Sequence, residues 1–187
     1  NLTSMLCEKC EYVTSIEFSK RRGEAIAKRL KDIENLELII GDLLDLNIEN
    51  SKYDYVTIIG FLEYAPIFFK QSKNPYLELL LWVKSKLKPD GKILLALNNS
   101  LGVQYLVGGS SSENEAPFNK IYNNSSNYFT RTGIQKLLNE ANLENFKFYY
   151  PLPNYEISNV IFSDDCSKNN SNPKLRPIFA PAFAEKE

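Results

Sequence analysis

Acidic side chains follow two predicted strands at the points where those strands end. Glu17 comes after the β-branched run at 12–16, and Asp42 comes after the apolar run at 36–40. A carboxylate only accepts hydrogen bonds, so Glu17 could accept both ribose hydroxyls of a nucleoside and Asp42 the amino group of adenine. Either acid could instead be a surface residue in a turn or a helix cap. An acid after a strand also holds the ribose of NAD in dinucleotide-binding folds, so the spacing does not choose the cofactor.

Segments of strand and helix period alternate along the first half of the chain. Strand-like runs lie at 12–16, 36–40, 53–59 and 92–97, and helix-like runs at 20–32 and 76–87. Because several strands are apolar on both faces, we predict a doubly wound, mostly parallel α/β sheet of the Rossmann type. Ligands of such sheets bind beyond the carboxyl ends of the strands. That rule also points to residues 60–64, after the third strand, and to Asn98 and Asn99, after the fourth.

The second half of the chain is less regular. Residues 98–127 are rich in Gly, Ser and Asn, which predicts a lid or a partly disordered loop. A helix is predicted at 132–142, and strands at 146–150 and 156–162. The link between these strands is too short for a parallel crossover, so we predict an antiparallel hairpin. We assign 1–163 to one domain and 164–187 to an extended tail or the start of a further element.

The composition excludes several classes of function. Lys plus Arg (22) nearly balance Asp plus Glu (23), so no overall charge favours nucleic acid. The 187 residues contain no histidine, which excludes Ser-His-Asp and Cys-His nucleophiles within them. Cys7 and Cys10 lack the further ligands of a zinc site, and we expect no metal. No apolar run of about 18 residues and no secretory signal is visible, so we expect no membrane span and a cytoplasmic location.

Four segments stand out by their order and spacing: VTSIEFS from Val13, IIGDLLDL from Ile39, YDYVTIIGFLEYAP from Tyr53 and LLLWVKSKLKPDGKILLALNN from Leu79. Together they resemble class I S-adenosylmethionine-dependent methyltransferases, and the turn LKPDGK before a strand is especially typical. The resemblance covers about residues 1–163. More weakly, NNSLGVQYLVGG from Asn98 and the segment from Phe129 to Asp165 are similar to methyltransferase domains encoded with bacterial surface-polysaccharide glycosyltransferases.

The resemblance implies S-adenosylmethionine as the cofactor and gives roles to eight residues. It places Glu17 on the ribose hydroxyls, Phe18 against the adenine, Asp42 and Leu43 at the adenine edge, Gly60 and Phe61 near the methionine part, and Glu63 and Tyr64 in the transfer zone as candidate catalytic residues. Ordinary core packing is the alternative for the two phenylalanines. For Tyr64 the alternative is a surface aromatic at a helix start.

One family feature is absent from this sequence. The glycine-rich loop that follows the family's first, central strand has no counterpart here. A central strand bonds to a neighbour on each side, so its absence would leave the strands at 12–16 and 53–59 with unpaired edges. We expect either that the sequence is a fragment of a longer chain, with impaired cofactor binding, or that something else fills the slot.

These observations predict methyl transfer to an oxygen or nitrogen of a small molecule or glycan, such as a saccharide or surface-glycan precursor. A fused or partner glycosyltransferase is an expected associate. Tyrosines available to stack on a sugar ring are Tyr105, Tyr122, Tyr128, Tyr149 and Tyr155. Two alternatives stay open at this point: an NAD(P)-dependent oxidoreductase of similar fold, and a catalytically silent methyltransferase-like binding module.

Overall fold

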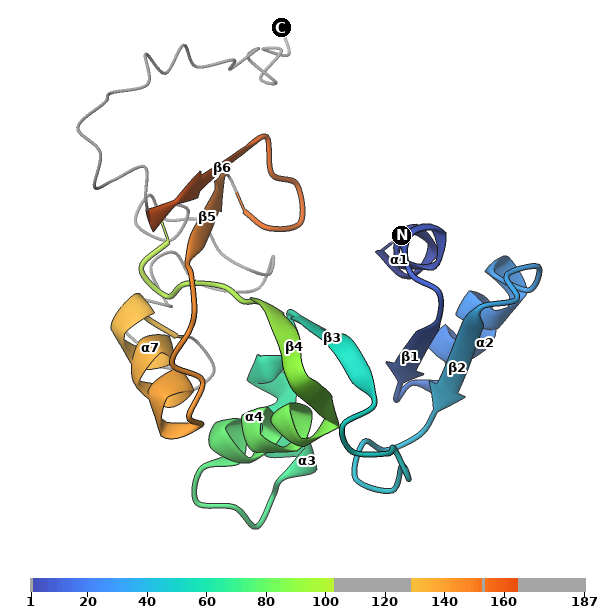
Figure 1. Cartoon of the computed structure of the whole chain (residues 1–187), viewed down its shortest axis with the longest axis horizontal. Coiled ribbons are helices and arrows are strands. Elements are labelled where there is room, and N and C mark those ends of the chain that lie inside the picture. The colour runs from blue at the N-terminus through green and yellow to red at the C-terminus, as the bar shows by residue number, and fades with distance from the viewer. Residues whose placement is uncertain (1, 103–128, 153, 165–187) are drawn as a thin grey trace, which may run out of the picture.

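The computed structural model describes residues 2–102, 129–152 and 154–164, and within these ranges the strands form three two-stranded sheets. Figure 1 shows the first sheet, with its two helices, on one side of the second sheet, and helix α7 on the other side. The third sheet lies above α7 in that view. Two of the three sheets are parallel and one is antiparallel. The predicted α/β class, with parallel strand pairs and a C-terminal antiparallel pair, is confirmed.

The first sheet is built from the elements α1 (Leu2–Lys9), β1 (Val13–Glu17), α2 (Lys20–Arg29) and β2 (Leu36–Ile40). Strands β1 and β2 pair in parallel with Val13 opposite Leu36 and Glu17 opposite Ile40. The side chain of Ser19 caps α2 by accepting a hydrogen bond from Arg22 N. Because the cap fixes where the helix begins, the strand must end at Glu17, two residues earlier.

The second sheet pairs β3 (Tyr53–Ile59) in parallel with β4 (Leu87–Ala96). Between them lie a 3₁₀ turn (Leu62–Tyr64), α3 (Ala65–Phe68) and α4 (Pro75–Lys86). Helix α4 begins with Asn74 as its cap, whose Oδ1 accepts from Leu77 N at 3.2 Å. Val56 lies opposite Ile93 and Ile59 opposite Ala96, so both strands end together. The segment after Ile59 therefore starts at the same edge as Asn98.

The third sheet follows α7 (Arg131–Glu140) and consists of β5 (Tyr149–Leu152) and β6 (Val160–Ser163). These strands are antiparallel, as predicted, with Tyr149 opposite Ser163. The hydroxyl of Tyr150 donates to Asp164 Oδ1 at 2.8 Å, and Arg131 donates to the other oxygen of that carboxylate at 2.9 Å. One carboxylate thus joins the end of the hairpin to the first turn of α7.

The buried core surrounds α4 and does not extend to the first sheet. Leu62, Ala65 and Leu80 have no exposed surface, and Leu79 has 1%. The remaining buried members of the cluster come from β3, α3, α4, α7 and nearby loops: Leu43, Ile58, Phe68, Val83, Ile134, Leu137, Leu138 and Ala141. Burial of this apolar surface is the main stabilising contribution to the fold. In contrast, no residue of β1 or β2 is fully buried.

Strands β1 and β3 face each other without pairing. No strand hydrogen bonds join them, so each has one open edge among the described residues. Side chains bridge the space at one end, where the Tyr53 hydroxyl donates to Thr14 Oγ1 at 3.1 Å. Tyr55 (64% exposed) and Ile16 (37% exposed) stand along the open edges. The two unpaired edges expected without a central strand are therefore present in the part of the chain that the structure describes.

Several predicted boundaries were wrong. The segment after Leu87, expected to be a tight turn before a strand at 92–97, is part of β4, with a register shift where Tyr53 lies opposite Leu87 and Tyr55 opposite Lys92. This shift accommodates the extra residues as a bulge. The last two strands begin at Tyr149 and Val160, later than predicted. The tail lies outside the described residues beyond Asp164, as does most of the predicted loop at 98–127.

Candidate functional site

Glu17, the last residue of β1, is held in place by the start of the next helix. Its Oε1 accepts from Ser19 N at 2.9 Å and from Arg22 Nη2 at 3.0 Å. Its side chain is 16% exposed, whereas that of Arg22 is 61% exposed. A cation in the first turn of a helix is unfavourable to the helix dipole, and this ion pair offsets that cost for Arg22. Both of these hydrogen bonds end on Oε1, which leaves Oε2 for another donor.

Asp42 and Leu43, after β2, point in different directions. Asp42 is exposed, and its Oδ1 accepts from Leu44 N at 3.1 Å, which is the turn interaction that the sequence left open as an alternative. Leu43 is 4% exposed and belongs to the core. Of these two residues, only Leu43 lines the cavity described next. The structure therefore brings Leu43, and not Asp42, to the same cavity as Glu17.

A cavity of about 450 Å³ lies between β1 and β3. It runs along both strands, from Tyr12 and Tyr53 at one end to Phe18 and Phe61 at the other. The lining is mainly apolar, and the charged side chains at the far end are Glu17 and Arg22. A volume in the range of about 300 to 1,000 Å³ with few polar groups is typical of small-molecule sites. We call this the strand cavity; part of it is the space left between the two open strand edges.

Four aromatic rings connect the end of the strand cavity to the segment after β3. Phe18 meets Phe68 edge to face with centroids 6.0 Å apart, and Phe68 meets Phe61 at 5.4 Å. Phe61 in turn lies 6.3 Å from Tyr64. Phe18 is still 48% exposed, and the guanidinium of Arg22 lies 5.2 Å from its ring centre. Phe18 and Phe61 line the cavity and also pack on the core residue Phe68, so both interpretations of these phenylalanines stay open.

Gly60, the first residue after β3, adopts a backbone that favours glycine. Its φ is +58°, and a Cβ added there would lie 2.6 Å from the hydroxyl oxygen of Tyr155. Its amide donates to Ala96 O at 2.8 Å, which continues the β3–β4 ladder by one residue. The left-handed conformation turns the chain away from the sheet and lets Tyr155 of the β5–β6 connection approach the backbone.

A second cavity, of about 430 Å³, opens beside Gly60, and we call it the Glu63 pocket. Its walls come from three places: the segment after β3, the end of β4 and the β5–β6 connection. The lining residues in that order are Gly60, Glu63, Tyr64, Pro66 and Ile67, then Asn98, then Tyr155 and Glu156. Both predicted catalytic residues therefore lie in one cavity, next to Gly60.

The carboxylate of Glu63 accepts few hydrogen bonds. Its Oε1 accepts from Asn98 N at 3.4 Å, near the limit for a hydrogen bond. Its Oε2 is buried and has no hydrogen-bond partner among the residues described. Leaving a buried acceptor unsatisfied costs about 1 to 3 kcal/mol. An N–H or O–H donor that reached Oε2 would remove that cost.

The eight predicted site residues thus divide between two neighbouring cavities. The strand cavity holds Glu17, Phe18, Leu43 and Phe61, the Glu63 pocket holds Gly60, Glu63 and Tyr64, and Asp42 lines neither. Sequence reasoning did not single out Phe68 or Glu156. The spacing of Phe61, Tyr64 and Phe68 by three and four residues is a helical signal that could have identified Phe68. No local pattern could have identified Glu156, because its position depends on the hairpin.

The two described cysteines differ in environment. Cys7 is buried and Cys10 is exposed. Burial raises the pKa of the Cys7 thiol, and the charge interaction with Cys10 raises it further by a smaller amount. A higher pKa lowers the reactivity of this thiol as a nucleophile. No group of three or more metal-binding side chains occurs within residues 2–102, 129–152 and 154–164. Within the same ranges, no helix has the length and apolar content that crossing a membrane requires.

Similarity to solved structures defines the fold. A SAM-dependent methyltransferase from Methanosarcina mazei matches with a TM-score of 0.58 and 15% identity, covering 84% of this chain and 82% of that one. A protein from Pyrococcus horikoshii matches with a TM-score of 0.56 and 20% identity, covering 87% and 74% of the two chains. The chain shares the Rossmann-like fold of both structures. No protein-family model matches it.

Curated relatives match part of the sequence. A demethylmenaquinone methyltransferase from Staphylococcus saprophyticus is 33% identical over 82 residues, which are 44% of this chain and 32% of that protein. The same enzyme from Staphylococcus aureus is also 33% identical over 82 residues. The matched region therefore spans about a third of the length of these relatives. None of these comparisons supports an association with glycosyltransferases.

Proposed function

We propose that the chain carries the cofactor-binding part of an S-adenosylmethionine-dependent methyltransferase. The observation that supports this most is the convergence of Glu17, Phe18 and Phe61 on one end of the strand cavity, beyond the carboxyl ends of β1 and β3. This is where ligands bind in open α/β sheets. The fold likeness to a SAM-dependent methyltransferase and the partial identity to two methylating enzymes support the choice of cofactor.

Glu17 is the proposed ribose ligand. Ser19 N and Arg22 hold its Oε1, so the carboxylate has a fixed orientation before any ligand binds. Its Oε2 would accept from the ribose hydroxyls, and the exposed face of Phe18 would lie against the adenine. Leu43 would contact the adenine edge through its apolar side chain. Asp42 could read the adenine amino group only if its bond to Leu44 N were given up or shared.

Gly60 and Phe61 are proposed to lie beside the methionine part of the cofactor. When bound, S-adenosylmethionine supplies an electrophilic methyl group on a sulfonium. The protein would contribute mainly proximity and alignment, by holding the acceptor atom in line with that group. For an acceptor that must lose a proton, Glu63 or Tyr64 is the proposed proton acceptor, since both line the adjoining pocket.

The acceptor proposed from the sequence is a small molecule, such as a saccharide or surface-glycan precursor, made available by a fused or partner glycosyltransferase. Of the tyrosines considered for stacking on a sugar ring, Tyr105, Tyr122 and Tyr128 lie outside the described residues. Tyr155 lines the Glu63 pocket, whereas Tyr149 is 58% exposed on β5. Tyr155 is therefore the tyrosine that we favour for an acceptor contact.

Calorimetry with two cofactors tests this proposal. We expect the full-length protein to bind S-adenosylmethionine and its product S-adenosylhomocysteine, and to give no heat with NAD or NADP. Binding of a nicotinamide cofactor alone would favour an oxidoreductase of similar fold. Absence of heat with every cofactor would favour a silent binding module.

A further inference from the structure

The Glu63 pocket has a definite chemical character. Its described polar groups are two carboxylates, two phenols and the amide of Asn98, and no Lys or Arg is among its described lining residues. Carboxylates accept hydrogen bonds and cannot donate them. The pocket therefore offers negative charge and acceptors to a ligand, and it would repel a phosphate or carboxylate group.

The backbone around Glu63 is anchored in the core. Leu62 and Ala65, on either side of it in sequence and within one turn, have no exposed surface. Tyr64 N donates to Phe61 O at 3.0 Å and so closes the 3₁₀ turn. These anchored neighbours fix the position of the Glu63 backbone beside the pocket.

Two aromatic rings and a second carboxylate add to the preference of the Glu63 pocket for a positively charged ligand. Tyr64 and Tyr155 line the pocket from different segments, and Glu156 follows Tyr155 on the β5–β6 connection. Cations are attracted to the faces of aromatic rings as well as to carboxylates. An ammonium group offers the N–H donors that Glu63 Oε2 lacks, together with a charge that both carboxylates favour. A neutral hydroxyl would supply the hydrogen-bond donor but not the positive charge.

The position of the pocket connects it to the proposed reaction. Gly60 lines the Glu63 pocket and Phe61, the next residue, lines the strand cavity. The peptide between these two residues thus lies between the two cavities. A ligand in the pocket would sit beside the place proposed for the methionine part of the cofactor.

We propose that the Glu63 pocket recognises the methyl acceptor by a protonated amine, which donates to Glu63 Oε2 and lies near the rings of Tyr64 and Tyr155. The acceptor is therefore a small molecule that carries an ammonium group and no anionic group close to it. Its assignment as an acceptor site rests on the proposed function, whereas the preference for a cation rests on the pocket alone.

Binding of a matched pair of probes tests the cation preference. Propylammonium and 1-propanol have the same number of heavy atoms and differ in charge. With ¹⁵N-labelled protein, we expect propylammonium to shift the amide signals of Gly60 and Asn98 saturably, and 1-propanol to bind at least about tenfold more weakly. Equal binding of the two probes, or shifts that do not saturate, would overturn the proposal.

Two variants and a control locate the effect. Glu63→Gln keeps the shape and removes the charge, and it should weaken propylammonium binding by about tenfold or more. Glu156→Gln, at an exposed position, should weaken propylammonium binding by a smaller factor. It provides the test of the pocket if Glu63→Gln does not fold. Glu144→Gln, exposed and outside the pocket, should have no effect. Unchanged binding in both pocket variants would contradict the proposal.

The cofactor experiment separates this proposal from the preceding one. Binding of propylammonium without S-adenosylmethionine binding would retain the cation site and reject the methyltransferase assignment. Binding of S-adenosylmethionine without propylammonium binding would retain the assignment and reject the cation site.

Discussion

Single residues at the ends of β1 and β3 determine the geometry of the candidate site. Glu17 is held by Ser19 N and Arg22, so the residue proposed to bind the cofactor is oriented by the first turn of α2. The sequence predicted the acid but not its bond to Ser19 N, because that hydrogen bond depends on the side-chain rotamer of Glu17. Arg22 lies in the first turn, where the helix dipole disfavours a cation, and it gains its partner in this way.

Gly60 carries a testable stability prediction. A side chain at this position would adopt the left-handed region and meet the Tyr155 hydroxyl at 2.6 Å. Gly60→Ala should therefore lower the free energy of unfolding by about 1 to 2 kcal/mol, measured by urea denaturation. Gly41→Ala is a suitable control, because Gly41 has no positive φ and its added Cβ would meet only a Leu46 methyl at 3.3 Å. An equal loss in both variants would contradict the role of the backbone conformation.

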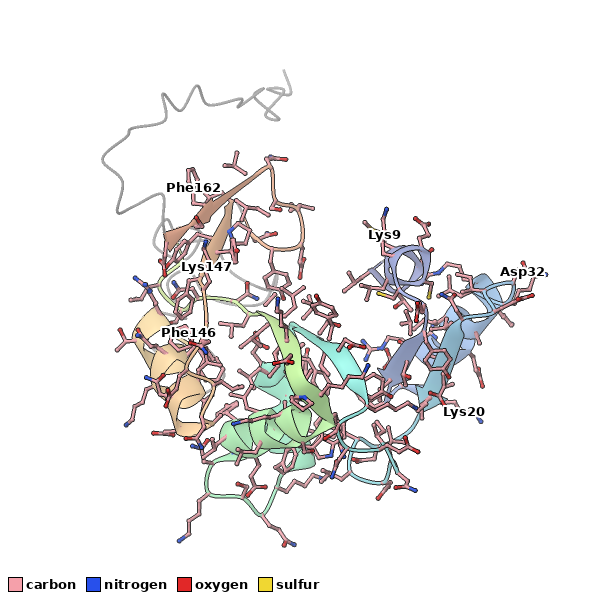
Figure 2. The ribbon with its side chains drawn as sticks, in the orientation of Figure 1. Lys9, Lys20, Asp32, Phe146, Lys147 and Phe162 are labelled. Atoms are coloured by element: carbon pink, nitrogen blue, oxygen red, sulfur yellow. The ribbon has the colours of Figure 1, made fainter. Side chains whose placement is uncertain are left out.

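At the scale of elements, the β5–β6 hairpin is tied to α7 through Asp164. Tyr150 and Arg131 each donate to one oxygen of that carboxylate. Figure 2 shows that Phe146 and Lys147, on the segment between α7 and β5, lie near the same end of the molecule as Phe162 of β6. The hairpin carries Tyr155 and Glu156, so this attachment also positions one wall of the Glu63 pocket.

The Tyr150–Asp164 bond predicts a pH dependence of stability. Burial and then the hydrogen bond to Asp164 raise the pKa of Tyr150 above its ordinary value of 10.0, while the charge of Arg131 opposes the shift. Between pH 10 and the higher folded-state pKa, the unfolded chain loses this proton and the native state keeps it, so stability falls as pH rises. Below pH 10 the Tyr150 hydroxyl is protonated in both states, and its full contribution to stability is present.

Tyr150→Phe measures this contribution. The variant should be less stable than the wild type by about 1 kcal/mol at pH 8, and the difference should shrink as the pH rises above 10. Urea denaturation at a series of pH values would give both curves. A difference that stays constant to pH 11.5 would show that the hydroxyl does not titrate as proposed.

Elements with strong local signals were predictable, and those that depend on distant partners were not. Strands β2 and β3 have the predicted bounds because each is a short apolar run flanked by polar residues. The extension of β4 to Leu87 could not be predicted, since it depends on pairing with Tyr53 across a bulge. The Glu63 pocket was predicted only in part, because Glu156 reaches it through the β5–β6 pairing.

At the scale of the whole molecule, the first sheet stands apart from the core. Figure 2 shows the side chains of Lys9, Lys20 and Asp32 on one side of the β3–β4 sheet, and those of Phe146 and Phe162 on the other. The strand cavity separates β1 from β3, and the core cluster takes its members mainly from β3 onward. A strand between β1 and β3 would pair both open edges and cover their apolar side chains.

Amide hydrogen exchange tests whether these edges are open in solution. Val13 N donates to Asn35 O and Gly60 N to Ala96 O, so alternate amides of β1 and β3 face the paired neighbour. By that alternation, the amides of Ser15 and Ile58 point to the paired strands, and the amides of Ile16 and Thr57 point to the strand cavity. We expect the latter two to exchange at least about tenfold faster than the former two. Similar protection of all four would mean that another segment pairs with these edges.

The central claim is that Glu17 binds the ribose of S-adenosylmethionine at the end of the strand cavity. Calorimetric titration of wild-type protein, Glu17→Ala and the exposed control Glu24→Ala with S-adenosylmethionine tests it most directly. Loss of a charged hydrogen-bond partner should weaken binding to Glu17→Ala by about 1 to 3 kcal/mol, or about 5- to 150-fold, and leave Glu24→Ala unchanged. A Glu17→Ala variant that folds and binds with wild-type affinity would contradict the account.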